Sequence, residues 1–225
     1  DGDSGRLLYG KEAQTALPNA STTKILTAYI IIRNCDLDDK VTVSADAIAN
    51  MADSSKCGLA AGDVLTVRDL LYGLLLVSGN DAANVLAEYY SGSIDKFAEE
   101  MNREAKALGA TQSHFVNANG LPDPNHYTSA HDMALIMQEC IKNETFCRIE
   151  SDLTYTIQPT NMTSTPRDLQ NHHALLFQDG QWGYKGAFAG KTGYTDEAHN
   201  TLVTAAKRGN MTLVCVVLTC DNLDY

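Results

Sequence analysis

Three short polar motifs in this sequence carry the residue types that acyl transfer requires. The first is Ser21-Thr22-Thr23-Lys24, in which a hydroxyl and an amine are three residues apart. On a helix, positions i and i+3 lie on one face, so the two groups can meet. A serine hydroxyl is a weak nucleophile until a base takes its proton, and a lysine whose pKa is lowered by burial or by a neighbouring cation can be that base. At a helix start, Ser21 would also lie near free backbone N–H groups, which favour a developing oxyanion.

This motif is weak evidence when it stands alone. Ser93-Ile94-Asp95-Lys96 has the same spacing. There the better interpretation is a helix cap, because Ser93 follows a glycine and precedes an amphipathic helix. In isolation, Ser21 would also be interpreted as a helix cap.

Two further motifs follow along the chain. Ser78-Gly79-Asn80 separates two apolar helical stretches, and Lys191-Thr192-Gly193 follows a glycine-containing segment near the C-terminus. Glycines in a strand permit close approach by a ligand, while Lys191 offers a charge and Thr192 a hydroxyl. Taken singly, the first suits a helix–helix turn and the second an edge-strand lysine that discourages aggregation. S-x-x-K, S-x-N and K-T-G in this order, however, form a specific combination.

The elements that must position these motifs are predicted from periodicity. The segment from Pro18 to about Arg33 predicts a helix that is apolar almost all round and therefore buried in the middle of the domain. Further helices are expected at 67–77, 81–90, 93–108 and 129–143, and strands at 6–11, 41–43, 186–195, 201–207 and 211–219. Gly209-Asn210 is a hairpin turn between the last two strands. The pattern indicates a mixed α/β fold, with an antiparallel sheet from the terminal segments and an inserted helical region from about 41 to 145.

Composition excludes some functions. The chain has 225 residues and a formal net charge of -11. Nucleic acid is not expected as a partner, since phosphate binding requires a basic surface. There is no apolar run long enough to cross a membrane, and the polar N-terminus has no signal peptide.

The cysteines and histidines predict neither a metal site nor a cofactor. The six cysteines form no C-x-x-C pair, and we favour mostly buried thiols. A bridge between Cys140 and Cys147 is the most plausible disulfide by sequence distance. The histidine pairs lack metal-binding spacing with a third ligand and are expected to be hydrogen-bonding or surface residues (His126 with His131, His172 with His173).

The sequence resembles the serine D-Ala-D-Ala carboxypeptidases, the low-molecular-mass penicillin-binding proteins. The resemblance covers nearly the whole chain and is carried by the three motifs with their flanks, at Leu17–Lys24, Leu70–Ala83, His114–Asn117, Asn125–Thr128 and Gly190–Thr195. It implies a β-lactamase/transpeptidase-like fold. The expected organisation is a single domain over 1–225, with a helical subdomain at about 41–145 and no separate C-terminal domain.

The resemblance also implies roles for the catalytic residues. Ser21 would be the acylated nucleophile and Lys24 its general base, within hydrogen-bonding distance of each other. Ser78 would relay a proton toward the leaving amine, with Lys191 nearby. Asn80 would hold the substrate amide.

Substrate binding is assigned in the same way. Thr192 and Lys191 would bind the terminal carboxylate, and Gly193 would leave room for the substrate. The backbone N–H groups of Ser21 and Tyr194 would form the oxyanion hole. We expect the peptide to lie antiparallel along the K-T-G strand as an added strand.

The implied substrate is a peptidoglycan stem peptide ending in acyl-D-Ala-D-Ala, with β-lactams as covalent inhibitors. Such an enzyme would act outside the membrane of a bacterium, in the cell wall, where it influences cell shape. It would attach to a membrane only through segments absent from this sequence.

Two alternatives stay open. A class A-like β-lactamase would require a carboxylate in an E-x-x-L-N segment, which is not found between Asp132 and Lys191, and the middle motif is S-G-N rather than S-D-N. A non-catalytic peptidoglycan-binding relative would have no use for the intact pair of Ser21 and Lys24. The product formed with a fluorescent penicillin would separate these possibilities.

Overall fold

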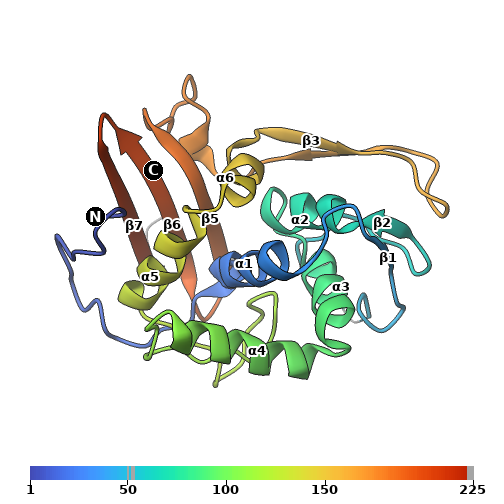
Figure 1. Cartoon of the computed structure of the whole chain (residues 1–225), viewed down its shortest axis with the longest axis horizontal. Coiled ribbons are helices and arrows are strands. Elements are labelled where there is room, and N and C mark those ends of the chain that lie inside the picture. The colour runs from blue at the N-terminus through green and yellow to red at the C-terminus, as the bar shows by residue number, and fades with distance from the viewer. Residues whose placement is uncertain (50, 52–53, 222–225) are drawn as a thin grey trace.

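A three-stranded antiparallel sheet forms one side of the molecule (Figure 1). This computed structural model describes residues 1–49, 51 and 54–221. The strands are β5 (Ala187–Thr195), β6 (His199–Arg208) and β7 (Met211–Cys220), in the order β5-β6-β7. The tight turn at Gly209-Asn210, where Gly209 has a φ of 58°, connects β6 to β7. The three predicted C-terminal strands are therefore confirmed, and β5 is an edge of the sheet.

Helix α1 (Lys24–Asn34) lies at the centre, beside β5 and between the other helices (Figure 1). It is buried from Lys24 through Ile31, as its apolar sequence predicts. The first turn is not α-helical, since Ala20–Thr23 forms a 3-10 helix, η1, that leads into α1. η1 packs directly against β5 and β6, which brings the start of α1 to the sheet.

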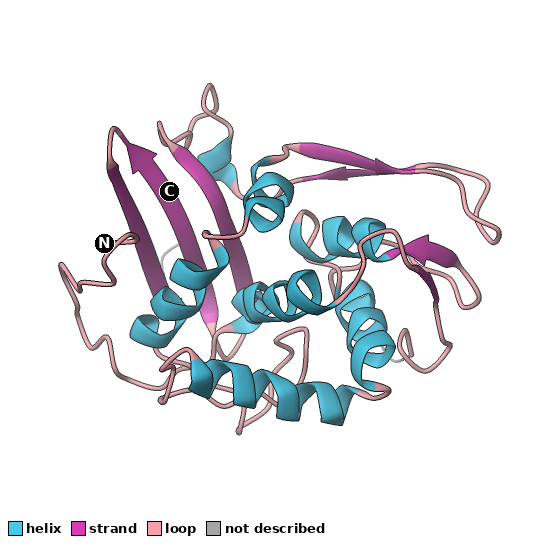
Figure 2. Cartoon of the chain, in the orientation of Figure 1, coloured by secondary structure: helices cyan, strands magenta, loops and turns pink. Residues whose placement is uncertain are grey.

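The remaining helices surround α1 (Figure 2). Their bounds are α2 (Val67–Leu75), α3 (Asn80–Ser91), α4 (Ile94–Ala107), α5 (Ala130–Cys140) and α6 (Glu144–Ser151). Ser93 and Ser129 cap α4 and α5 by accepting hydrogen bonds from the N–H groups of Lys96 and Asp132. The four helices predicted between 67 and 143 are confirmed, whereas α6 was not predicted. None of the described helices combines the length and apolar character that a membrane span needs.

Two small hairpins complete the structure. β1 (Lys40–Thr42) pairs with β2 (Val64–Thr66), and β3 (Thr154–Ile157) pairs with β4 (Arg167–Gln170). Of these strands, the sequence predicted only the first. The β3–β4 hairpin is held against α2 by the rings of Tyr72 and Tyr155, which stack with centroids 3.7 Å apart. Strands of three or four residues contain too few alternating apolar and polar positions to be predicted from the sequence alone.

The predicted strand at 6–11 is wrong. These residues form no strand, and Leu7, Leu8 and Tyr9 are exposed. It is an earlier residue, Gly2, that lies beside the sheet, with its N–H donating to the Thr212 carbonyl of β7 at 2.8 Å. Apolar residues alone do not make a strand, because its backbone groups need a neighbouring strand to bond.

The Cys140–Cys147 bridge, the most plausible disulfide by sequence distance, does not form, since both of these cysteines are free thiols. The thiol of Cys140 points to the Ile25 carbonyl, and that of Cys147 points to the Ile141 carbonyl. The expectation of mostly buried thiols holds for only two, because Cys57 and Cys140 are buried, Cys215 is exposed and the other three are half-buried.

Candidate active site

Ser21 and Lys24 meet at the junction of η1 and α1. The Lys24 Nζ lies 2.9 Å from the Ser21 Oγ, which confirms the predicted hydrogen bond between them. Ser21 is not at a helix cap, because the N-cap positions of η1 and α1 are Asn19 and Thr23. The preceding residue, Ala20, has a φ of 47°, a conformation that costs a non-glycine residue energy and is concentrated at functional sites.

Lys24 is completely buried and its amine has three hydrogen-bond partners. Besides Ser21, these are the Asn80 Oδ1 at 2.7 Å and the Asn119 carbonyl at 2.6 Å. Burial lowers the pKa of Lys24 well below its usual value, and the nearby Lys191 charge lowers it further. A neutral amine in contact with the Ser21 hydroxyl is suited to remove the proton from that hydroxyl.

A hydrogen-bond chain supports the strained turn before Ser21. Thr23 Oγ1 donates to the Ala20 carbonyl at 2.8 Å, and His126 Nε2 lies 2.8 Å from Thr23 Oγ1. Because the Val116 N–H donates to His126 Nδ1 at 3.2 Å, the proton of the neutral ring is on Nε2. Burial lowers the pKa of His126 to about 4, which keeps the ring neutral.

Sequence reasoning assigned no active-site role to these supporting residues. Gly120 approaches the same turn so closely that a Cβ there would lie 1.9 Å from the Ala20 carbonyl oxygen. Its φ of +85° also favours glycine. In the sequence, the Asn119-Gly120 pair predicts a tight turn, but it does not show that this turn contacts Ala20.

The S-G-N motif occupies the sharp connection between α2 and α3. Ser78 is buried and has a φ of 60°, a second strained position. Gly79 leaves no space for a side chain, since a Cβ would lie 2.9 Å from the Gly73 carbonyl oxygen and 2.8 Å from Asp81 Oδ1. Asn80 reaches Lys24, as described above, so the S-G-N and S-x-x-K motifs are in direct contact. The Ser78 hydroxyl makes no hydrogen bond to Ser21 or Lys24 among those formed by the described residues.

The buried carboxylate of Asp81 organises the loop that covers this connection. It accepts hydrogen bonds from the N–H groups of Cys57 and Gly58, both at 3.0 Å, and of Leu59 at 3.1 Å. With the Ala82 N–H at 2.9 Å there are four backbone donors, which satisfy an ionised carboxylate well. The buried carboxylate of Asp81 therefore serves to hold this loop in place.

The K-T-G motif lies on β5, against η1. Lys191 is buried, and its Nζ donates to the Thr192 carbonyl at 2.8 Å. Burial lowers the pKa of Lys191 to about 8. A Cβ on Gly193 would lie 2.8 Å from the Ser21 backbone nitrogen and 3.1 Å from the Ala20 Cβ, so the nucleophile turn is packed directly against this strand.

The free edge of β5 presents backbone groups to the site. The Gly190 N–H donates to Glu150 rather than to β6, so it faces the free edge. Since the direction of N–H and C=O groups alternates along a strand, those of Thr192 and Tyr194 face the same edge. The bond from Lys191 to the Thr192 carbonyl agrees with this direction. The Tyr194 side chain is exposed, so it is the backbone of this residue that belongs to the site.

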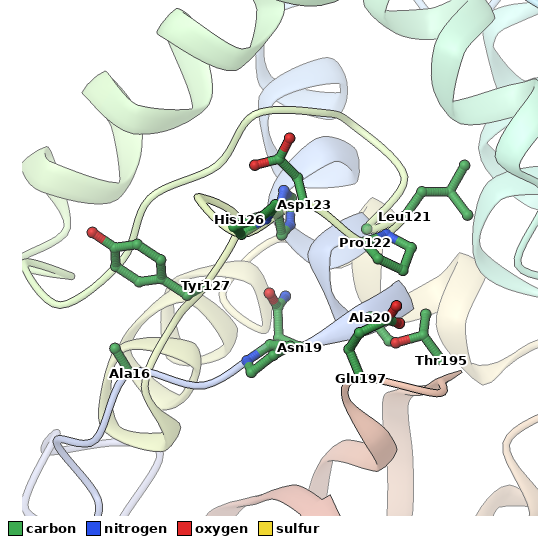
Figure 3. Close-up of a pocket in the computed structure, with 13 residues that line it drawn as sticks. Ala16, Asn19, Ala20, Leu121, Pro122, Asp123, His126, Tyr127, Thr195 and Glu197 are labelled. Atoms are coloured by element: carbon green, nitrogen blue, oxygen red, sulfur yellow. The ribbon is translucent and has the colours of Figure 1, made fainter.

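A pocket of about 440 Å³ adjoins the nucleophile turn (Figure 3). Asn19 and Ala20 form its floor, the loop that carries Leu121 and Asp123 closes one side, and Thr195 and Glu197 at the end of β5 close another. None of the site residues predicted from the sequence lines it. Among the described residues, no cluster of His, Cys, Asp and Glu could hold a metal ion.

The described geometry unites the three motifs around one serine, and comparison with known proteins identifies the family. A family model for D-alanyl-D-alanine carboxypeptidases matches residues 1–222. The chain belongs to this family. The β-lactamase/transpeptidase-like fold implied by the sequence is confirmed by solved structures. The crystal structure of a D-alanyl-D-alanine carboxypeptidase from Mycobacterium tuberculosis superposes on this chain with a TM-score of 0.88. The two sequences are 36% identical, and the match covers 97% of this chain and 79% of that one.

Other relatives agree. A crystal structure of a Streptomyces DD-transpeptidase superposes with a TM-score of 0.89 at 34% identity, covering 97% of this chain and 86% of that one. In sequence, this carboxypeptidase-family chain is 39% identical to D-alanyl-D-alanine carboxypeptidase DacB2 of M. tuberculosis, over 97% of this chain and 72% of the relative. It is 37% identical to D-alanyl-D-alanine carboxypeptidase DacF of Bacillus subtilis over 96% of this chain, but spans only 54% of that relative.

Proposed function

We propose that this chain is a serine D-alanyl-D-alanine carboxypeptidase, which removes the terminal D-Ala of peptidoglycan stem peptides through an acyl-enzyme on Ser21. The observation that carries the proposal is the 2.9 Å contact between the Ser21 Oγ and the amine of the buried Lys24. Family membership and the named relatives support the same reaction.

Acylation starts with the proton of the Ser21 hydroxyl, which passes to the neutral Lys24 amine as Oγ attacks the carbonyl of the penultimate D-Ala. The carbonyl oxygen becomes an oxyanion, held by the N–H groups of Ser21 and Tyr194. Each such donor is worth a few kcal/mol in a preorganised site. The C–N bond then breaks, and the leaving D-Ala amine takes a proton through Ser78. Water hydrolyses the resulting ester and restores Ser21.

The substrate is held by β5 and by the S-G-N loop. The terminal carboxylate binds Thr192 and Lys191, and the peptide lies antiparallel along the free edge of β5 as an added strand. Asn80 uses its Oδ1 for Lys24, which leaves its Nδ2 to donate to a substrate carbonyl. Gly193 leaves room for the substrate to reach Ser21. The pocket beside Ala20 offers space for the upstream part of the stem peptide.

The proposed reaction also indicates which molecules the protein binds and where in the cell it acts. β-lactams mimic acyl-D-Ala-D-Ala and acylate Ser21, while nucleic acid is not a partner. The enzyme acts outside the membrane of a bacterium, at the cell wall, as a secreted protein with an effect on cell shape. Residues 1–225 form one catalytic domain, with the helical region at about 41–145 as a subdomain.

The experiment is labelling with a fluorescent penicillin, followed by mass spectrometry of the labelled peptide. Ser21→Ala abolishes the label and leaves the fold intact, because the Ser21 side chain caps no helix. The matched control is Ser93→Ala, in the second S-x-x-K of the chain. Ser93 caps α4, so this variant loses about 1 kcal/mol of stability and keeps full labelling.

Each outcome has a distinct meaning. A stable adduct on Ser21 together with release of D-Ala from a D-Ala-D-Ala peptide supports the proposal. Rapid release of hydrolysed penicillin would instead indicate a β-lactamase. A wild-type protein that forms no adduct would indicate a non-catalytic binding relative.

A further inference from the structure

The pocket beside Ala20 lies where the upstream part of the proposed substrate passes. A peptide that is added antiparallel to β5 runs in the direction opposite to that strand. With its terminal carboxylate at Thr192 and its scissile carbonyl at the Tyr194 N–H, its earlier residues continue toward Thr195. Thr195 lines the pocket. The first side chain upstream of the two D-Ala residues is therefore the one that enters this pocket.

The charged side chains at the pocket are acidic. Asp123 comes from the loop that follows Gly120, and Glu197 comes from the turn between β5 and β6 (Figure 3). No lysine or arginine is among the described residues that line it. His126 also lines the pocket, and its ring is neutral as described above. The electrostatic potential of the pocket therefore favours a cationic group on the ligand.

Both carboxylates have oxygen atoms available for such a group. Asp123 Oδ1 accepts from the Asn125 N–H at 2.7 Å, which orients the carboxylate and leaves its Oδ2 for another donor. Glu197 forms no hydrogen bond or ion pair with any other described residue. The neighbouring Asp196 differs, because it accepts from the Tyr194 hydroxyl at 3.2 Å and does not line the pocket.

Asn19 adds a buried acceptor at the floor of the pocket. Its Nδ2 donates to Thr22 Oγ1 at 3.3 Å and to Thr23 Oγ1 at 2.8 Å. Both hydroxyls donate onward to backbone carbonyls, so it is the nitrogen of the amide that faces them. The Asn19 Oδ1 is buried without a hydrogen-bond partner among the described residues, and Figure 3 shows this amide amid the lining side chains. A buried acceptor without a donor is costly, and an N–H group of a ligand would satisfy it.

The loop on one side of the pocket suits the aliphatic part of a long amine side chain. Leu121, Pro122 and Pro124 line the pocket and present an apolar surface. A lysine-like side chain packs its methylene groups on such a surface while its charge stays at polar groups. The loop is held by two hydrogen bonds, from the Leu121 N–H to Asn119 Oδ1 at 2.8 Å and from Asn117 Nδ2 to the Leu121 carbonyl at 3.0 Å. The pocket is therefore formed before the ligand binds.

We propose that this pocket is a subsite for the side chain that precedes D-Ala-D-Ala, and that it selects stem peptides in which this side chain ends in a free primary amine. The ammonium group is attracted by the carboxylates of Asp123 and Glu197 and donates to Asn19 Oδ1. Acetylation of the amine removes its charge and two of its three N–H donors, so the modified peptide loses these interactions. The inference rests on the proposed function and adds the specificity of the upstream site.

The test compares two peptides, Nα-acetyl-L-Lys-D-Ala-D-Ala and the same peptide acetylated also on Nε. At low ionic strength we expect kcat/KM of the wild-type protein to be about tenfold higher for the free amine, as for other hydrogen bonds to a charged group. The difference is in KM, since the amine is remote from the scissile bond, and it narrows as salt is added. Equal values of kcat/KM for the two peptides overturn the inference.

The variant that tests the residues combines Asp123→Asn with Glu197→Gln, which keeps the shapes and removes both charges. We expect KM for the free-amine peptide to rise until the two peptides agree within about twofold. Benzylpenicillin carries no amine and acylates this variant at the wild-type rate. The matched control is Asp196→Asn, which removes a charge from the same turn outside the pocket and keeps the preference. A double variant that retains the preference, or a control that loses it equally, overturns the inference.

A second measurement requires no turnover. Isothermal titration of the Ser21→Ala protein with each peptide gives the two dissociation constants, and we expect the free amine to bind about tenfold more tightly. Equal dissociation constants overturn the inference. The proposed function fails separately, if the wild-type protein releases D-Ala from neither peptide. The two dissociation constants then still decide whether the pocket selects an amine.

Discussion

Gly193 on β5 faces the backbone nitrogen of Ser21 with no space for a side chain between them. A Cβ at this position would lie 2.8 Å from that nitrogen and 2.5 Å from Thr201 Oγ1. The same nitrogen is one of the two proposed oxyanion donors. The spacing between β5 and the nucleophile turn is therefore set by the absence of a single methyl group.

Gly193→Ala forces β5 and the turn at Ser21 apart. We expect penicillin acylation to slow by at least about tenfold, because a displaced oxyanion donor costs a few kcal/mol. We also expect the overpacking to lower the stability of the fold by about 1–3 kcal/mol. Stopped-flow acylation and thermal unfolding measure the two effects. Gly10→Ala, in an exposed segment where a Cβ would meet only the side chains of Ala13 and Leu7, is the control and leaves the acylation rate unchanged. Wild-type acylation in Gly193→Ala would refute the assigned geometry.

Asn80→Asp places a negative charge 2.7 Å from the Lys24 amine without changing the shape of the side chain. A neighbouring anion raises the pKa of a lysine, so the base is protonated at neutral pH and acylation shifts to higher pH. The measurement is the pH profile of the penicillin acylation rate, whose acidic limb moves upward by one unit or more. Asn210→Asp, in the exposed hairpin turn, is the control. An unmoved limb would show that Lys24 is not the base.

Thr192→Val removes a hydroxyl proposed to bind the terminal carboxylate and keeps the shape of the side chain. We expect a tenfold or greater loss of kcat/KM on a D-Ala-D-Ala peptide, since a hydrogen bond to a charged group contributes about 1.5–3 kcal/mol. Thermal stability stays within about 0.5 kcal/mol, as at other partly exposed sites. A peptide with an amidated C-terminus is the control substrate and shows a smaller difference between wild type and variant. Full activity on the free acid would exclude this role for Thr192.

His126 makes stability depend on acid pH. Its pKa is about 4 in the folded protein and about 6.5 in an unfolded chain, so between these values the unfolded chain binds more protons. The contribution of the neutral His126 ring to the free energy of unfolding is complete above pH 6.5. It is lost as the pH falls toward 4, and the loss reaches roughly 3 kcal/mol. His126→Gln flattens the pH dependence of the free energy of unfolding in this window, measured by urea denaturation. His131→Gln, on the partly exposed start of α5, leaves it as in wild type. An unchanged slope in His126→Gln would mean that folding does not lower the pKa of this ring.

Features that depend on local spacing could be predicted from the sequence alone. Ser21 and Lys24 meet because they are three residues apart on one turn, and α4 begins after Ser93 because that side chain caps its own helix. Periodicity over ten or more residues predicted the long helices and the sheet strands. The chemistry followed from the order of the three motifs, each of which is weak alone.

The distant groups that complete the site could not be predicted from the sequence, because the folding of the chain brings them there. Asn119 and His126 reach the nucleophile turn across 95 and 103 residues of chain, and Glu150 reaches β5 across 40. The prediction of a strand at 6–11 was wrong for the same reason, since a strand forms only where another chain segment supplies its hydrogen bonds. Contacts of this kind depend on how the helices pack against the sheet. That packing is set by the burial of the whole core and not by any short stretch of sequence.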